Sequence, residues 1–269
     1  MLRVEELADE KNIIFMLILV ALLSLTSCGN RTERFSETGF DSPEDAIITY
    51  LEGLRDSDLE RMVSAFAIET LVENFSLEEQ LNRFQVYDTR MEPRLPNTNE
   101  FITEINVERR RGSVVDWISR QIIFLSGPDL AELAGQGIHR VDDESEGFVR
   151  QFNESLDALN LQSIEILGFI PLQAFDDLVN ALEEHLALQT IVFNSDQLIG
   201  RIAVFELDGE TFFLAVDVVN YDGRWYILHL GGGTGTMLGF NDNWQGILLP
   251  RYTELFDILQ AMVPLSTES

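Results

Sequence analysis

Side chains that act as nucleophiles or bind soft metals are scarce in this 269-residue chain. Cys28 is its one cysteine and Lys11 is its one lysine. From residue 29 onward the sequence therefore offers no thiolate nucleophile, disulfide, Schiff-base lysine or lysine for a phosphate-binding loop. The three histidines, at positions 139, 185 and 229, are too far apart for an HExxH zinc motif. We assign no catalytic residue, no metal ligand and no cofactor.

Three expected strands, at 199–207, 211–220 and 224–230, form the strongest candidate for a binding face. Asp-Gly pairs at 208–209 and 222–223 separate the strands, and such pairs favour two-residue hairpin turns. Turns of that length set the register, so each side chain can be assigned a cross-strand partner and a sheet face.

That register places Arg201 and His229 each opposite Val216, on one face with Trp225 and other aromatic residues. An apolar face with two groups able to carry positive charge could bind a small ligand. Arg201, Trp225 and His229 are therefore ligand-binding candidates. The alternative for His229 is a hydrogen-bonded core histidine. Asp217 falls on the other face, and only a β-bulge would bring it level with His229.

Hydrophobic periodicity and end signals predict the elements that position this face. Ser42 and Pro43 begin a helix, and residues 56–58 end it and begin a second one. Further helices are expected at 71–87, 114–125, 148–159, 172–188 and 251–262, a strand at 161–170 and a turning loop at 231–239.

Residues 97–160 follow a segment that contains Pro93 and Pro96 and are interpreted as a helical insertion that folds on the outside of the sheet. Within this block, Arg109 to Arg111 form a local basic run. We expect these arginines to pair with the chain's own carboxylates.

The first 28 residues have the pattern of a secretion signal. Basic residues precede an apolar run at 13–23, which has about half of the ~20 residues that a membrane-spanning helix needs. The tetrad "LTSC" that ends at Cys28 resembles a bacterial lipobox, which implies cleavage before Cys28 and acylation of that cysteine. The alternative is a buried helix that ends in an ordinary cysteine.

This interpretation divides the chain into a lipoprotein signal peptide at 1–27, a polar tether at 28–40 and a folded domain at 41–269. Two or three acyl chains would anchor the protein stably at the membrane. The expected location is the cell membrane, with the domain on its extracytoplasmic face.

Charge restricts the partners of such a domain. The chain has 18 basic and 46 acidic residues, for a formal net charge of −28. Nucleic acid and anionic lipid headgroups would be repelled, so the acyl chains are the expected membrane contact. The remaining candidates are a small apolar ligand or an envelope protein.

Two segments carry a resemblance to a known superfamily. "SPEDAIITYLEGLRDSDLERMVSAFA" at 42–67 and "VVNYDGRWYILHL" at 218–230 resemble the opening helices and closing hairpin of the nuclear transport factor 2-like superfamily. The resemblance implies an α+β fold in which N-terminal helices pack on a curved antiparallel sheet and enclose a pocket. Residues 97–160 have no counterpart in that core.

Members of this superfamily range from isomerases and dehydratases to non-catalytic binding domains, so fold alone does not select an activity. We expect a membrane-anchored lipoprotein with a non-catalytic module that binds a small ligand or a protein. The alternative is a pocket enzyme of the isomerase or hydrolase type that uses His229.

Overall fold

The computed structural model describes residues 37, 39–85, 87, 93, 95–127, 145–170, 172, 176–239, 246–248 and 259. Glu37–Ser269 form one compact unit, separate from Met1–Ser36. The predicted signal peptide, Cys28, His139 and all but one residue of the predicted helix at 251–262 lie outside the described residues. Among the described residues, no helix combines the length and apolar character needed to cross a membrane.

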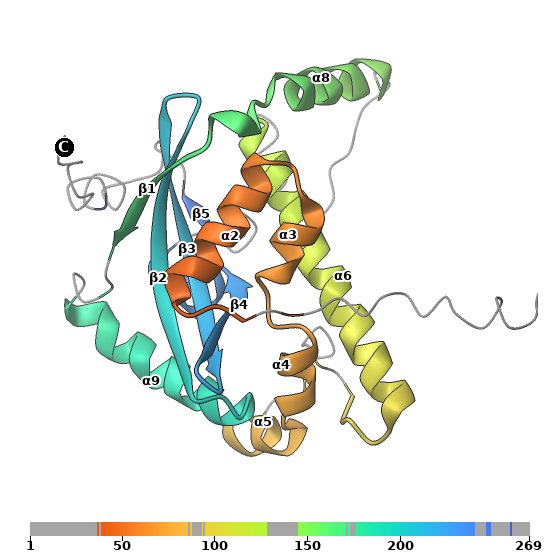
Figure 1. Cartoon of the computed structure of the whole chain (residues 1–269), viewed down its shortest axis with the longest axis vertical. Coiled ribbons are helices and arrows are strands. Elements are labelled where there is room, and N and C mark those ends of the chain that lie inside the picture. The colour runs from red at the N-terminus through yellow and green to blue at the C-terminus, as the bar shows by residue number, and fades with distance from the viewer. Residues whose placement is uncertain are drawn as a thin grey trace, which may run out of the picture. The chain divides into compact units, whose positions relative to one another are not determined.

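Helices precede and interrupt an antiparallel sheet (Figure 1). The elements in chain order are α2 (Pro43–Arg55), α3 (Leu59–Ser64), α4 (Glu69–Asn74), α5 (Leu77–Phe84), α6 (Glu100–Leu125), α8 (Ser145–Ala158), the 3-10 helix η1 (Leu161–Ser163), β1 (Glu165–Ile170), α9 (Asp176–Val192), β2 (Gln197–Leu207), β3 (Glu210–Tyr221), β4 (Arg224–Leu230), α10 (Gly232–Met237) and β5 (Ile247–Leu248). The predicted α+β fold class, with N-terminal helices and an antiparallel sheet, is confirmed.

The strands follow the order β1-β2-β3-β4, and β5 pairs with β3 beyond the end of β4. The turn residues Asp208, Gly209, Asp222 and Gly223 have φ values of 51°, 80°, 52° and 76°. Positive φ at both central residues is the type I′ geometry that suits a two-residue hairpin, so both predicted turns are confirmed. Between β2 and β3 the predicted register also holds, with Arg201 opposite Val216.

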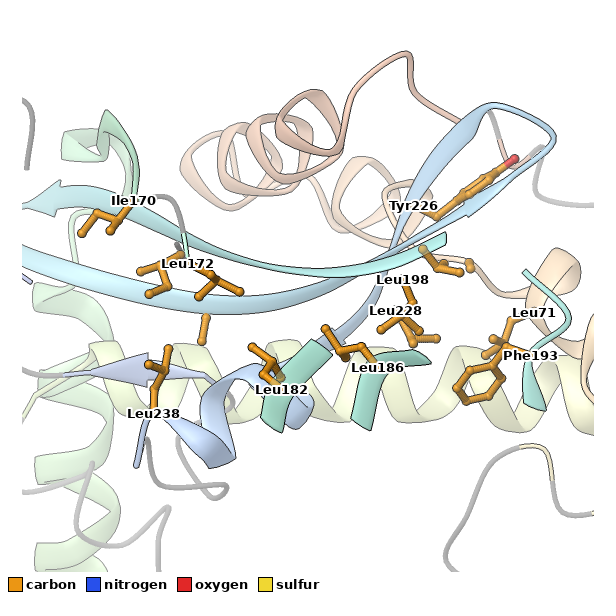
Figure 2. Close-up of a cluster of buried hydrophobic side chains, with 14 of the residues drawn as sticks. Leu71, Ile170, Leu172, Leu182, Leu186, Phe193, Leu198, Tyr226, Leu228 and Leu238 are labelled. Carbon is orange, nitrogen blue, oxygen red and sulfur yellow. The ribbon is translucent and has the colours of Figure 1, made fainter. Parts of the chain in front are cut away.

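Helices cover both faces of this sheet. In Figure 2 the N-terminal helices lie above the strands, and the parts of α9 that carry Leu182 and Leu186 lie below them. These two leucines belong to a buried apolar cluster with Leu198 of β2 and Leu228 of β4. Two apolar sheet faces therefore have separate helical covers.

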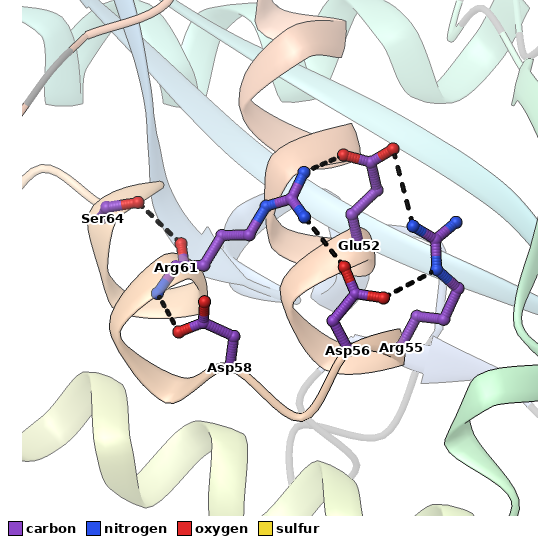
Figure 3. A network of polar contacts seen from close by, with 6 residues as sticks. All are labelled: Glu52, Arg55, Asp56, Asp58, Arg61 and Ser64. Atoms are coloured by element: carbon purple, nitrogen blue, oxygen red, sulfur yellow. Dashed lines mark hydrogen bonds and ion pairs between the residues drawn. The ribbon is translucent and has the colours of Figure 1, made fainter.

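The first two helices begin at the polar caps that the sequence predicts. The Ser42 hydroxyl accepts the N–H of Asp45, and the Asp58 carboxylate accepts the N–H of Arg61, each at 3.0 Å. Arg61 also reaches back to Glu52 and Asp56 across the α2–α3 corner (Figure 3). These ion pairs are partly exposed, so each contributes at most about 1 kcal/mol.

Two predicted elements differ in the structure. The helix expected at 71–87 is divided into α4 and α5, because Ser76 starts a new helix by accepting the N–H of Glu79 at 3.2 Å. The loop expected at 231–239 contains the short helix α10, whose first N–H groups donate to the carboxylate of Asp217. In both places a side-chain cap decides the backbone path.

Helix α6 is longer than predicted and belongs to the core. Arg110 is 1% exposed, and its guanidinium donates from Nε to the Ala67 carbonyl at 3.2 Å and from Nη2 to the Leu228 carbonyl. The hydroxyl of Tyr50 donates to the side chain of Gln121. Within the block that we interpret as an insertion, α6 is therefore bonded to α2 and β4 in the interior of the protein.

We predict that Arg110→Met destabilises the protein by about 2–4 kcal/mol, because two buried carbonyl oxygens lose a donor. The matched control is Arg111→Met, which breaks an exposed ion pair with Glu60 (2.9 Å) and is expected to cost less than about 1 kcal/mol. Urea unfolding followed by tryptophan fluorescence measures both losses. Equal losses in the two variants would show that the buried bonds of Arg110 do not stabilise the fold.

Candidate functional site

A groove of about 350 Å³ lies between α9 and β2. Its floor consists of the buried leucines 172, 182, 186 and 198, which gather between helix and sheet in Figure 2. Its rim carries Glu183, Ala187, Thr190, Asp196 and Gln197. The volume is at the lower end of the range for small-molecule sites. The groove can therefore hold a small apolar molecule or a few residues of a peptide.

The helix and strand periodicities explain how the lining arises. Leu182 and Leu186 are four residues apart, so they point from the same side of α9 toward the sheet, and Glu183 and Ala187 follow one position later at the rim. On β2, a side chain at Gly200 would collide with Thr234 and Leu172. Glycine at this position lets α10 and Leu172 pack directly against the strand.

The charged side chains that line the groove leave an excess of negative charge at its rim. The guanidinium of Arg201 pairs with the carboxylate of Glu44 at 2.7 Å, so its positive charge is offset. Glu183 and Asp196 are exposed, and neither forms an ion pair with a described residue. The open rim of the groove therefore has negative potential.

The structure does not bring the three predicted ligand-binding residues together. Arg201 lines the groove. Trp225 lies at the start of β4, where its backbone exchanges two hydrogen bonds with Phe40, of 2.8 and 3.0 Å. His229 lies near the end of β4 and is not a lining residue. Of these three residues, only Arg201 therefore lines this groove.

The predicted partner of His229 is also wrong. Leu230 lies opposite Val216, and His229 lies opposite Asp217, because the β3–β4 register shifts where Leu228 is inserted. This is the β-bulge that the register argument named as the exception. The imidazole of His229 packs against Trp117 of α6, with 5.4 Å between ring centroids.

Burial and the nearby Arg110 both disfavour the charged form of His229. The guanidinium of Arg110 lies 4.8 Å from the centre of the Trp117 ring. Burial and the nearby positive charge of Arg110 together lower the pKa of His229 to about 3. His229 is therefore neutral at pH 7.

Asp217 shares a ladder position with His229 but bonds elsewhere. Its carboxylate accepts the N–H groups of Gly233 at 2.7 Å and Thr234 at 3.1 Å. Burial raises the pKa of Asp217, and hydrogen bonds from Thr234 and Gly233 and the proximity of His185 oppose that rise. Among the described residues no hydrogen bond joins Asp217 to His229. Asp217 holds α10 in place.

The sequence reasoning missed the α9 side of the groove. The i, i+4 spacing of Leu182 and Leu186 was visible, but it equally fits a helix packed flush on the sheet. Only the tertiary structure leaves a space between α9 and β2. Within the described residues, no group of three or more histidine, cysteine or acidic side chains is placed to hold a metal ion.

Comparisons with known proteins add little to this geometry. No protein-family model matches the sequence, and no curated protein matches it. The chain is similar to a solved structure, a cystatin-like protein from Ruminococcus gnavus, with a TM-score of 0.38 and 12% sequence identity over 69% of this chain. It spans 39% of the length of that protein.

The low pKa of His229 predicts a pH-dependent stability. The folded state keeps the imidazole neutral, whereas the unfolded chain takes up a proton near pH 6.5, so acid favours unfolding between pH 6.5 and about 3. We expect the wild type to lose about 1–2 kcal/mol more between pH 7 and pH 5 than His229→Gln does. Urea unfolding at both pH values measures the difference. The same loss in both proteins would mean that His229 titrates normally.

Proposed function

We propose that this chain is a lipid-anchored extracytoplasmic binding protein whose domain holds an apolar ligand, or a segment of an envelope protein, in the α9–β2 groove without catalysis. The groove carries the proposal, because it combines buried leucines with an open rim. Apolar surface that a partner covers supplies roughly 25 cal/mol per Å² of buried area.

The lining favours binding over catalysis. Among the described lining residues there is no histidine, cysteine, serine or tyrosine, and the carboxylates of Glu183 and Asp196 are on the exposed rim. The alternative, an isomerase or hydrolase that uses His229, requires that histidine in a pocket with an acid within reach. His229 instead packs on Trp117 beside the guanidinium of Arg110.

The anchor part of the proposal rests on the apolar run at 13–23 and the lipobox-like tetrad that ends at Cys28. In this proposal the tether ends before Glu37, because Glu37 and Phe40 contact the domain directly. The carboxylate of Glu37 accepts the N–H groups of Ile68 (2.7 Å) and Thr70 (3.2 Å), and Phe40 pairs with Trp225. The nine residue-to-residue steps from Cys28 to Glu37 span at most about 30 Å, so the domain would stay close to the membrane.

The superfamily proposal rests on how the two resembling segments meet. The segment after α3 pairs with β4: the N–H of Ile227 donates to Ala65 at 2.8 Å, and the N–H of Ala67 donates to Ile227 at 3.0 Å. The opening helices and the closing hairpin are thus in direct contact, as the nuclear transport factor 2-like resemblance implies. That contact supports assigning the domain to this superfamily.

Acylation of Cys28 is tested by metabolic labelling with an alkyne fatty acid. The wild type should incorporate the label, and Cys28→Ser should not, because the sulfur is the acceptor of the first diacylglyceryl group. The variant should also keep its signal peptide and migrate more slowly on a gel. Equal labelling of both proteins would rule out this anchor.

Ligand binding in the groove is tested by photolabelling the full chain in detergent with a diazirine-bearing decanol. Mass spectrometry should map label to 182–201. Ala187→Trp should reduce this labelling at least threefold, because the indole fills the groove from its rim. Ile191→Trp is the control, since Ile191 is on the same helix, 42% exposed and outside the lining. Similar labelling in both variants, or none at 182–201, would contradict the proposed site.

A further inference from the structure

Among the described residues, the outer edge of β2 is paired with a strand over only part of its length. β2 runs from Gln197 to Leu207, but β1 pairs with it only from Ile202 to Glu206. Beside 197–201 no other strand of the described residues lies on this edge. The groove follows the same stretch, because each residue from Gln197 to Arg201 lines it.

The hairpin register shows which backbone groups face this open edge. The two-residue turn makes Leu207 and Glu210 the closing pair, so the odd-numbered residues of β2 bond to β3 and the even-numbered residues point away. Leu198 and Gly200 therefore direct their N–H and C=O groups outward. The Gly200 carbonyl accepts a hydrogen bond from the guanidinium of Arg201 at 3.0 Å, in agreement with this direction.

The opposite edge of the sheet, formed by β4, is bonded to other segments of the protein. Along β4, Trp225 exchanges hydrogen bonds with Phe40, and Ile227 exchanges them with Ala65 and Ala67. Proteins commonly cover or interrupt their sheet edges because an exposed edge pairs with other chains. Between Gln197 and Arg201 no described strand pairs with the edge, and an apolar groove lies beside it, which is the arrangement used for strand addition.

The side chains around the edge specify the chemistry of a partner strand. Successive side chains of a partner strand would point to opposite faces of the sheet, so every second one would enter the groove over Leu182 and Leu186. Glu183 and Asp196 on the rim have no ion-pair partner among the described residues, and the whole chain carries a net charge of −28. A second copy of this chain would be repelled, whereas a segment with basic ends would be attracted.

We infer that the occupant of the groove is an extended polypeptide segment of another protein, apolar at alternate positions and flanked by basic residues, which adds to the sheet beside Leu198 and Gly200. This inference rests on the proposed function and names its partner. The added strand continues the edge where the pairing of β1 ends. Its backbone bonds to Leu198 and Gly200, and its apolar side chains cover the leucine floor.

A synthetic peptide tests this inference. The probe is a capped octapeptide in which valine and threonine alternate between two terminal arginines, titrated by calorimetry into the full chain in detergent. Two further peptides carry N-methyl groups on either the three valine amides or the three threonine amides. Because alternate amides of a strand face the same neighbour, one methylated peptide should bind at least tenfold more weakly and the other within threefold of the parent.

Charge variants supply the second readout. Glu183→Lys reverses a charge on the rim and should weaken peptide binding at least fivefold. Glu184→Lys, one residue along the same helix and outside the lining, makes the same change in net charge and should have a smaller effect. Added salt should weaken binding to the wild type.

The possible failures are distinguishable. Equal binding by both methylated peptides would overturn strand addition. Decanol labelling at 182–201 without peptide binding would overturn the inference and leave the proposed binding function standing. If neither decanol labelling at 182–201 nor peptide binding is seen, both the proposed binding function and this inference are overturned. A concentration-dependent dimer that excludes the peptide would assign the edge to a second copy and overturn the inference.

Discussion

The arrangement of this domain depends on one buried cation. The guanidinium of Arg110 bonds to the carbonyls of Ala67 and Leu228, and so joins α6 to the segment after α3 and to β4. Leu228 is the inserted residue of the β3–β4 bulge, so its carbonyl lacks a regular ladder partner and is available to the arginine. Burying an unpaired charge costs free energy. The two carbonyl hydrogen bonds and the face of the Trp117 ring offset that cost for the guanidinium of Arg110.

The bulge at Leu228 also sets which residues lie opposite each other at the end of β4, including His229 and Asp217. It places His229 opposite Asp217, yet the imidazole contacts Trp117 while the carboxylate caps α10. Two residues that could form an acid–base pair are thereby used to hold different elements. The groove lies on the other side of β3, between α9 and the part of β2 that no described strand pairs on its outer edge.

The two sheet edges differ in how far described segments pair with them, and the acidity of the protein bears on that difference. β4 is closed by Phe40 and by residues 65–67, which are bonded to it directly. The stretch of β2 that no described strand pairs has carboxylates beside it, and a net charge of −28 favours repulsion between copies of the chain. Charge can therefore limit self-association while leaving the backbone accessible to a basic partner.

The sequence by itself determined the local features: the caps at Ser42 and Asp58, the type I′ turns, the strands around them and the α+β class. These depend on backbone geometry within a few residues, which side chains such as serine, aspartate and glycine control directly. The tertiary structure alone decided the burial of Arg110, the bulge at Leu228 and the space between α9 and β2. Each of these depends on contacts between segments that lie tens of residues apart in the sequence. A single arginine, or a pair of leucines at i and i+4, is compatible with several such packing arrangements, so the sequence does not select one of them.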